Sequence, residues 1–204
     1  WYGYGLTSVA GVLYHFLTRT VEDRWSVPFF GALLITSGDH GATWQLPDGR
    51  AATAESVGDS PDAGFFWKED KDWAFSQIAF VQCGQDNGAA RDESVYLYSP
   101  NGKRPHELNL ARVPRDRIRD RSAYRFFVRY DPAGAPVWTD SADLLGRGPV
   151  HCFPEGWGLY SWHPSVIYNP PLDLFIMANG ATERSGDTWM HDRTGSLGFW
   201  WSSD

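Results

Sequence analysis

The sequence has little positive charge and no long apolar run. It contains 18 lysine and arginine residues against 25 aspartate and glutamate residues, which gives a formal net charge of −7 at pH 7. This balance removes the usual electrostatic basis for binding nucleic acid or an anionic membrane surface. No apolar stretch approaches the ~18 residues that cross a bilayer as a helix. We therefore expect no nucleic-acid partner and no membrane partner, and neutral or cationic ligands fit better.

Cysteine and histidine are scarce, and their spacing matches no metal motif. Cys83 and Cys152 form neither a CxxC pair nor a zinc pattern, so a disulfide and two small buried thiols both stay open. The 6 histidines make no HExxH motif, because "HELNL" from His106 lacks the second histidine. We expect no catalytic zinc and no required cofactor. A structural Ca²⁺ held by carbonyl and carboxylate oxygens stays open, although the sequence has no EF-hand loop.

Motifs of two large groups of enzymes are also missing. No GxSxG elbow is present to expose a nucleophilic serine. "GYG" and "GDTW" lack the lysine and the glycine spacing of a phosphate-binding loop. The sequence therefore argues against a serine hydrolase of the elbow type and against a nucleotide enzyme.

Aromatic residues, glycine and proline are abundant, and strand-like segments recur. Of the 204 residues, 16% are aromatic, with 11 tryptophans, 21 glycines and 13 prolines. "LYHF" at 13–16 recurs as "VYLY" at 95–98 and "LFIM" at 174–177, each between two further strand candidates. Turn residues between these short strands favour antiparallel meanders. We predict an all-β fold, a β-propeller of four-stranded antiparallel blades. It would form a single domain over residues 1–204, with about three to four blades, approximately at 1–60, 61–140 and 150–204.

The stretch "SGDHGATW" at 37–44 predicts a specific turn at the end of a hairpin. Ser37 and Asp39 have short side chains that accept hydrogen bonds from nearby backbone N–H groups, and Gly41 can adopt positive φ. With Thr43 and Trp44, the spacing resembles the Asp-box of sialidase-like propellers. In those families the box is structural and joins the two outer strands of a blade, so the resemblance implies architecture and no catalyst.

Both ends of the sequence suggest a propeller that is incomplete. Trp1 already belongs to an aromatic, strand-like stretch, and "FWWSSD" from Phe199 parallels "LITSGD" from Leu34, as if a second box were beginning. We expect a fragment of a larger protein. Open blade edges carry unpaired backbone groups, so we also expect a tendency to self-associate through them.

A family resemblance extends over most of the chain. The stretches "LNLARVP" from Leu108 and "SLGFWWS" from Ser196 are its most distinctive parts, together with "LYSWHPSVIYNPPLDLFIMANG" from Leu159. They resemble a bacterial family of five-bladed propellers, formerly of unknown function, that includes endo-D-arabinanases. The resemblance implies a secreted or cell-surface glycoside hydrolase acting on an arabinofuranose-containing or related polysaccharide. Because fold does not fix chemistry, a non-catalytic carbohydrate-binding propeller and a purely structural module stay open as alternatives.

Two candidate loops place acids beside tryptophans. Aromatic faces stack on the C–H faces of sugars, and burial among them disfavours a charged carboxyl, which could then act as a general acid. Glycoside hydrolysis by this route needs a second carboxylate. We interpret Glu155 as the acid and Asp70 as its partner, although Glu155 capping a Pro-Glu-Gly turn is the structural alternative. The substrate-binding candidates are Trp67, Trp73, Gln77, Trp157, Trp162, His163, Trp189 and His191.

Two features limit this candidate site. His163 and His191 can each hydrogen-bond a sugar hydroxyl or a carboxylate, but a structural role for an imidazole stays open. Related propeller glycosidases commonly take an essential acid from the first blade, and "WYGYGLTSVAG" from Trp1 has none. If the parent protein supplies that acid from elsewhere, we expect this chain alone to be inactive.

Overall fold

The protein is all-β, as the sequence predicts. The structure is a computed structural model, and it describes residues 2–20, 29–57, 66–68, 74–100, 104, 106–153, 162–182 and 195–203. Within these ranges the α-helical structure is limited to α1 (Ala54–Val57). Short 3₁₀ turns occur at Gln85–Asn87, Arg121–Ala123 and Leu144–Gly146.

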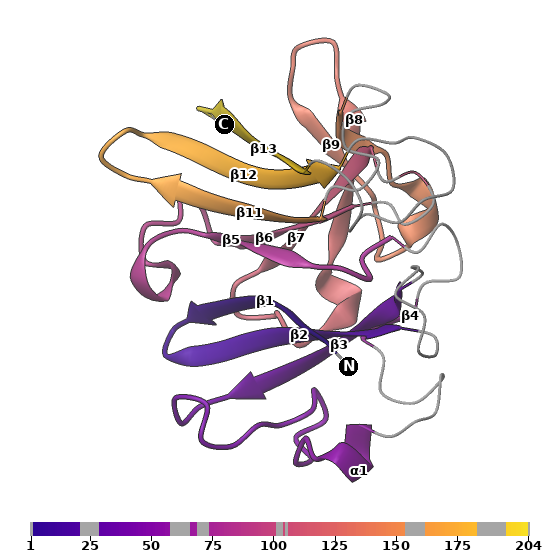
Figure 1. The fold of residues 1–204 in the computed structure, drawn as a ribbon, viewed down its shortest axis with the longest axis vertical. Coiled ribbons are helices and arrows are strands. Elements are labelled where there is room, and N and C mark those ends of the chain that lie inside the picture. The colour runs from indigo at the N-terminus through magenta and orange to yellow at the C-terminus, as the bar shows by residue number, and fades with distance from the viewer. Residues whose placement is uncertain are drawn as a thin grey trace.

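The first blade is a sheet of four antiparallel strands. Its order is β1 (Tyr2–Val9), β2 (Val12–Thr20), β3 (Phe29–Ser37) and β4 (Trp67–Lys68). Two separate segments pair with the outer edge of β3. Gln45 bridges Thr36 near the end of β3, whereas β4 pairs with Gly31 and Ala32 near its start. The segment between these two pairings contains α1, which lies at the outer side of the sheet (Figure 1).

The second blade is one of two antiparallel parts of a larger, nine-stranded sheet. It contains β5 (Ala79–Gln82), β6 (Ser94–Pro100), β7 (Glu107–Pro114) and β8 (Arg125–Tyr130), which pair in that order. Two short strands extend it. β9 (Pro136–Trp138) pairs with β8, and β10 (Pro149–Cys152) pairs with β7.

The third blade completes the nine-stranded sheet. β11 (Trp162–Asn169), β12 (Leu174–Thr182) and β13 (Gly195–Ser202) form an antiparallel meander. Three strands are therefore described where the propeller pattern has four.

The first strands of the blades lie next to one another. β11 pairs in parallel with β5, with Val166 opposite Val81. On the other side of β5, the backbone N–H of Gly5 in β1 donates to the carbonyl of Ile78 at 2.8 Å. Figure 1 shows β5 between β1 and β11, with the first and third blades extending in opposite directions. This arrangement of inner strands confirms the propeller fold class, while the assignment of 1–204 to one incomplete domain stays a prediction.

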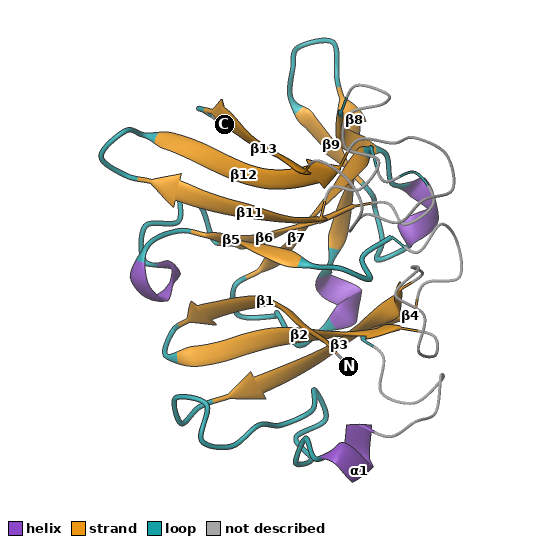
Figure 2. Ribbon diagram, in the orientation of Figure 1, coloured by secondary structure: helices purple, strands orange, loops and turns teal. Residues whose placement is uncertain are grey.

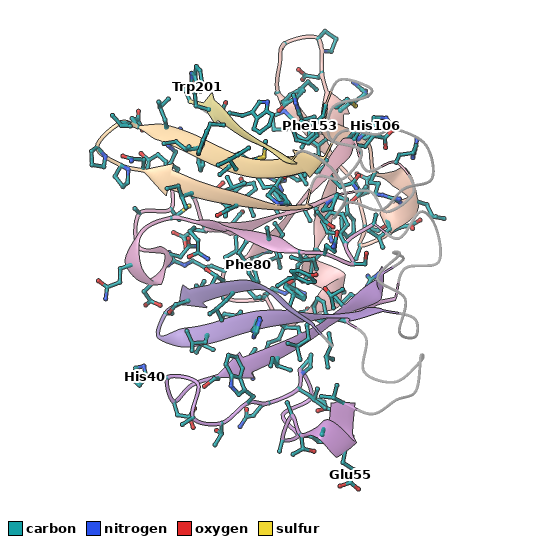
Figure 3. The ribbon with its side chains drawn as sticks, viewed as in Figure 1. His40, Glu55, Phe80, His106, Phe153 and Trp201 are labelled. Atoms are coloured by element: carbon teal, nitrogen blue, oxygen red, sulfur yellow. The ribbon has the colours of Figure 1, made fainter. Side chains whose placement is uncertain are left out.

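Apolar residues fill the spaces between the blades. The cluster between the first and second blades contains Phe16, Phe75, Phe80 and Phe126, each at most 3% exposed. Figure 3 shows Phe80 at this interface. Burying one such side chain stabilises the fold by about 1.5 to 3 kcal/mol. A smaller cluster around Val166 joins the second blade to the third.

The two cysteines are free thiols. Cys83 is buried at the end of β5, and Cys152 is exposed at the end of β10. Of the two alternatives, the structure therefore shows unpaired thiols, of which Cys83 alone is buried.

Candidate functional site

The two ends of the blades differ in the connections they carry. At one end lie the tight turns after β1 and β11 and the turn that follows β3, which appear together on the left of Figure 2. At the other end, which we call the loop end, β5 and β11 begin, and the β2–β3, β6–β7 and β12–β13 connections attach. Because the inner strands are parallel and each blade is antiparallel, these strand ends share one face. The segments that contain Asp70 and Glu155 lead into β5 and β11 and therefore attach at the loop end.

The "SGDHGATW" turn lies at the opposite end and satisfies its own polar groups. Ser37 Oγ donates to Asp39 at 2.7 Å and accepts from Gly41 N–H at 2.8 Å. Thr43 donates to Asp39 through its backbone N–H at 2.9 Å and its hydroxyl at 2.6 Å. The Thr43 hydroxyl, followed by its N–H and by Ser37, lowers the pKa of Asp39 to about 2. Trp44 packs on the outer apolar cluster of the first blade. The geometry is that of a structural turn, and its assignment as an Asp-box stays a prediction.

The predicted site residues divide into four groups. Gln77 is buried, with 8% of its surface exposed. Trp162 and His163 are the first two residues of β11, so they lie at the loop end. Trp67 lies in β4, the outermost strand of the first blade, rather than in a loop as expected. The other predicted residues lie outside the described residues: Asp70, Trp73, Glu155, Trp157, Trp189 and His191.

Gln77 and Trp162 lie near the starts of the two paired inner strands, β5 and β11. Val166 is opposite Val81, and Ile167 is opposite Gln82, which is a constant offset of 85 residues (166 − 81 = 167 − 82). Gln77 lies two residues before β5, and Trp162 is the first residue of β11, whose register is irregular between Trp162 and Ser165. The parallel pairing of β5 with β11 thus brings two predicted sugar-binding residues to the same end of the same pair.

Three buried amide side chains lie towards the loop end. Gln77, Asn109 and Asn179 are 8%, 1% and 2% exposed. Each has one buried polar atom without a partner among the described residues: Nε2, Nδ2 and Oδ1, respectively. A buried polar group without a partner costs about 1 to 3 kcal/mol. Such groups are expected where a fold keeps polar atoms available for a ligand or an ordered water.

Glu107 is the buried carboxylate among the described residues. It is 9% exposed, begins β7 at the loop end, and forms an ion pair with Arg104 at 3.1 Å. Its strand neighbour in β10 is Cys152, and the next residue, Phe153, donates its N–H to the carbonyl of His106 at 2.8 Å. Figure 3 shows His106 and Phe153 close together. The second blade therefore fixes the start of the segment that contains Glu155 beside Glu107.

Sequence analysis missed Glu107, Asn109 and Asn179. "HELNL" was considered only as an incomplete zinc motif. A usable signal was present, because Glu107 and Asn109 share a strand face with Ala111 and Val113, which are fully buried. Polar residues that continue an apolar face at the start of a strand indicate a buried polar site.

The described residues contain no group of three or more histidine, cysteine, aspartate or glutamate side chains that could hold a metal ion. In the same part of the chain, no helix is long and apolar enough to cross a membrane.

Comparisons with known proteins show only distant likenesses. No protein-family model matches the chain, and no curated protein matches it. A Bacteroides ovatus protein that is provisionally assigned as a hydrolase is similar in structure at 14% identity, with a TM-score of 0.48 over 88% of this chain. The chain spans 38% of that protein's length. A GH62 hydrolase solved in complex with xylotriose is similar at 10% identity and a TM-score of 0.26, covering 97% of this chain and 90% of its own. Neither TM-score reaches 0.5, so neither likeness supports an argument about activity.

Proposed function

We propose that this chain carries the substrate-binding face of a propeller glycoside hydrolase that acts on an arabinofuranose-containing or related polysaccharide. Glu155 serves as the general acid and Asp70 as the second carboxylate. The observation that carries the proposal is the parallel pairing of β5 with β11. The chain segments that lead into these two strands contain Asp70 and Glu155, so both acids attach to the same end of adjacent strands.

The surroundings of this end suit a neutral sugar. Trp162 supplies an indole ring for stacking on a sugar face, as sugar-binding sites commonly require. Gln77 and Asn179, at the same end, each have an amide atom without a partner among the described residues, which can bind a hydroxyl group directly or through water. Glu107 lies where the segment that contains Glu155 begins, and its ion pair with Arg104 compensates its charge.

The proposal places the protein outside the cell, secreted or on the surface of a bacterium, where polysaccharide is its partner. No cofactor is required, and a structural Ca²⁺ is compatible with the chemistry. The third blade leaves Trp201 and Phe199 exposed on its open side, 74% and 59% respectively, which suits association through that blade.

Substituting the proposed acid tests the function. We expect Glu155→Gln to lower the turnover of an arabinofuranose polymer by about 10²- to 10⁴-fold with little change in affinity, because the amide cannot donate the catalytic proton. Asp70→Asn should lower turnover as well. The measurement is the release of reducing ends by the protein that carries this chain, together with binding of the same polymer.

Glu55→Gln is the matched control, since Glu55 is exposed on α1 far from the loop end (Figure 3). Its turnover should equal that of the unmodified protein. Binding of the polymer without any hydrolysis would instead favour the non-catalytic carbohydrate-binding module. Neither binding nor hydrolysis would contradict both functions.

A further inference from the structure

A cavity lies between the second and third blades, lined mainly by β6, β8 and β9. Its volume is about 320 Å³, near the lower end of the range of small-molecule sites. This space suits a single ring better than an extended chain. Six aromatic side chains line it: Tyr96, Tyr98, Phe127, Tyr130, Trp138 and Phe175.

The aromatic walls come from distant parts of the chain and are held by one another. Phe127 meets Trp138 and Tyr130 edge to face, with ring centroids 6.1 and 4.9 Å apart. Tyr96 also contacts Trp138, at 6.2 Å. Arg112 lies 4.3 Å over the Trp138 ring and fixes its orientation further. The walls are therefore preorganised, which lowers the entropic cost of binding a ligand.

The charged side chains at the cavity are already paired with other groups of the protein. Arg91 donates to the carboxylate of Asp173 and lies 4.7 Å over the Tyr168 ring. Asp92 accepts from the N–H of Ser94 at 2.8 Å and from the hydroxyl of Tyr96 at 2.7 Å. Arg91 is compensated by its ion pair with Asp173, and both carboxylate oxygens of Asp92 already accept hydrogen bonds, so neither side chain needs a charged ligand as its partner.

Two polar groups in the walls remain without partners. The Nε1 of Trp138 is buried and has no acceptor among the described residues. The hydroxyl of Tyr98, in the middle of β6, likewise has no hydrogen bond within the part of the chain that the structure describes. Burial raises the pKa of Tyr98 to about 12, so this hydroxyl is a donor at neutral pH. Because Trp138 Nε1 is fully buried, the Tyr98 hydroxyl is the group to which a sugar oxygen in the cavity would supply an acceptor.

We propose that this cavity binds one neutral sugar unit, at a site separate from the proposed active site. Its flat aromatic walls, the Trp138 ring among them, suit the apolar face of a sugar ring, and the Tyr98 hydroxyl suits an oxygen at its rim. The site does not depend on the catalytic proposal, because the argument for it uses only lining residues that the structure describes, and Asp70 and Glu155 are not among them.

Nuclear magnetic resonance of the ¹⁵N-labelled protein tests the site, with the methyl glycosides of arabinose, xylose and galactose as probes. The indole cross-peak that disappears in Trp138→Phe identifies Trp138. We expect at least one methyl glycoside to shift this cross-peak saturably, with an affinity in the millimolar range. Tyr98→Phe should weaken binding by about 2- to 10-fold, as one lost hydrogen bond predicts. The spectra themselves show whether each variant is folded.

The matched control is Trp201→Phe, which removes a highly exposed indole outside the cavity and should leave the affinity unchanged. Glu155→Gln should also leave it unchanged, so that failure of the catalytic proposal and failure of this one are distinguishable. No shift of the Trp138 cross-peak with any of the sugars would overturn the proposal. A shift with phenol but with no sugar would overturn it too, since the cavity would then take an apolar ligand.

Discussion

The two interfaces between neighbouring blades differ in how completely they are packed. Between the first and second blades, Phe16, Phe75 and Phe126 are each 0% exposed, and T-shaped and tilted ring pairs leave a continuous core. Between the second and third blades, the buried residues are Val81, Cys83 and Val166, and Tyr96, Tyr98 and Phe175 remain half-buried around the cavity. The first interface stabilises the fold, whereas the second gives up packing and retains space for a ligand.

Truncating one aromatic residue in each interface should separate their roles most strongly. Phe16→Ala is expected to lower the free energy of unfolding by about 3 to 5 kcal/mol, because it leaves a cavity in a closed core. Phe175→Ala, which enlarges an existing and partly open cavity, should cost less than about 2 kcal/mol. Urea denaturation measures both. Equal losses would show that the second interface is as tightly packed as the first.

A smaller effect is expected where β1 approaches β5. A Cβ on Gly5 would lie 2.4 Å from the carbonyl oxygen of Ile78, so Gly5→Ala must push the two inner strands apart. We expect a loss of about 1 to 3 kcal/mol. Gly38→Ala is the control, because a Cβ there meets nothing within 4 Å. If both variants unfold at the same urea concentration, the inner strands are not in close contact.

The pH dependence of stability should sharpen the comparison at the second interface. Burial raises the pKa of Tyr98 to about 12, and burial with a hydrogen bond to Asp92 raises the pKa of Tyr96 to about 12. The folded state holds these protons where the unfolded state, with a tyrosine pKa near 10, releases them. Stability should therefore be full below pH 10 and fall between pH 10 and 12. Tyr98→Phe should make this fall shallower, and an unchanged slope would exclude a buried phenol.

The smallest effect is expected at the turn beyond β3, which belongs to neither interface. The folded pKa of Asp39, about 2, lies below its ordinary value. Its contribution is present above pH 4 and is lost as the pH falls from about 4 to 2. Asp39→Asn should make the melting temperature depend less on pH in this window. It should leave the fall in stability between pH 10 and 12 unchanged. A change in that fall would mean that the turn is coupled to the blade interfaces.

Local sequence pattern predicted the strands well because their side chains alternate. "VYLY" lies in β6, where Val95 and Leu97 face the first blade while Tyr96 and Tyr98 face the third. The charged stretch from Arg112 to Tyr124 has no such alternation, yet some of its residues are buried. Ile118 is 1% exposed and Tyr124 is 0% exposed, and the Tyr124 hydroxyl donates to the carbonyl of Ile118 at 2.6 Å. Two buried residues six positions apart, among many charged ones, do not give a periodic pattern of hydrophobicity in the sequence.

The candidate site was only partly accessible to sequence reasoning. Acids beside tryptophans could be found by their types, and Gln77 and Trp162 could be named as sugar-binding candidates. Their alignment depends on the pairing of β5 with β11, which lie 85 residues apart (166 − 81), and no local pattern encodes such a contact. The cavity was missed for the same reason. Tyr98, Trp138 and Phe175 come from three strands and form a site only when the β8–β9 hairpin and β12 meet β6.

By itself, the sequence determined the all-β class, the short antiparallel strands and the turns, because alternation and turn chemistry act over a few neighbouring residues. Only the tertiary structure decided which inner strands meet, which end of the blades collects the loops, where Glu107 is buried, and where a cavity remains. These features depend on contacts between residues far apart along the chain, whose free energy is gained only when whole sheets pack against one another.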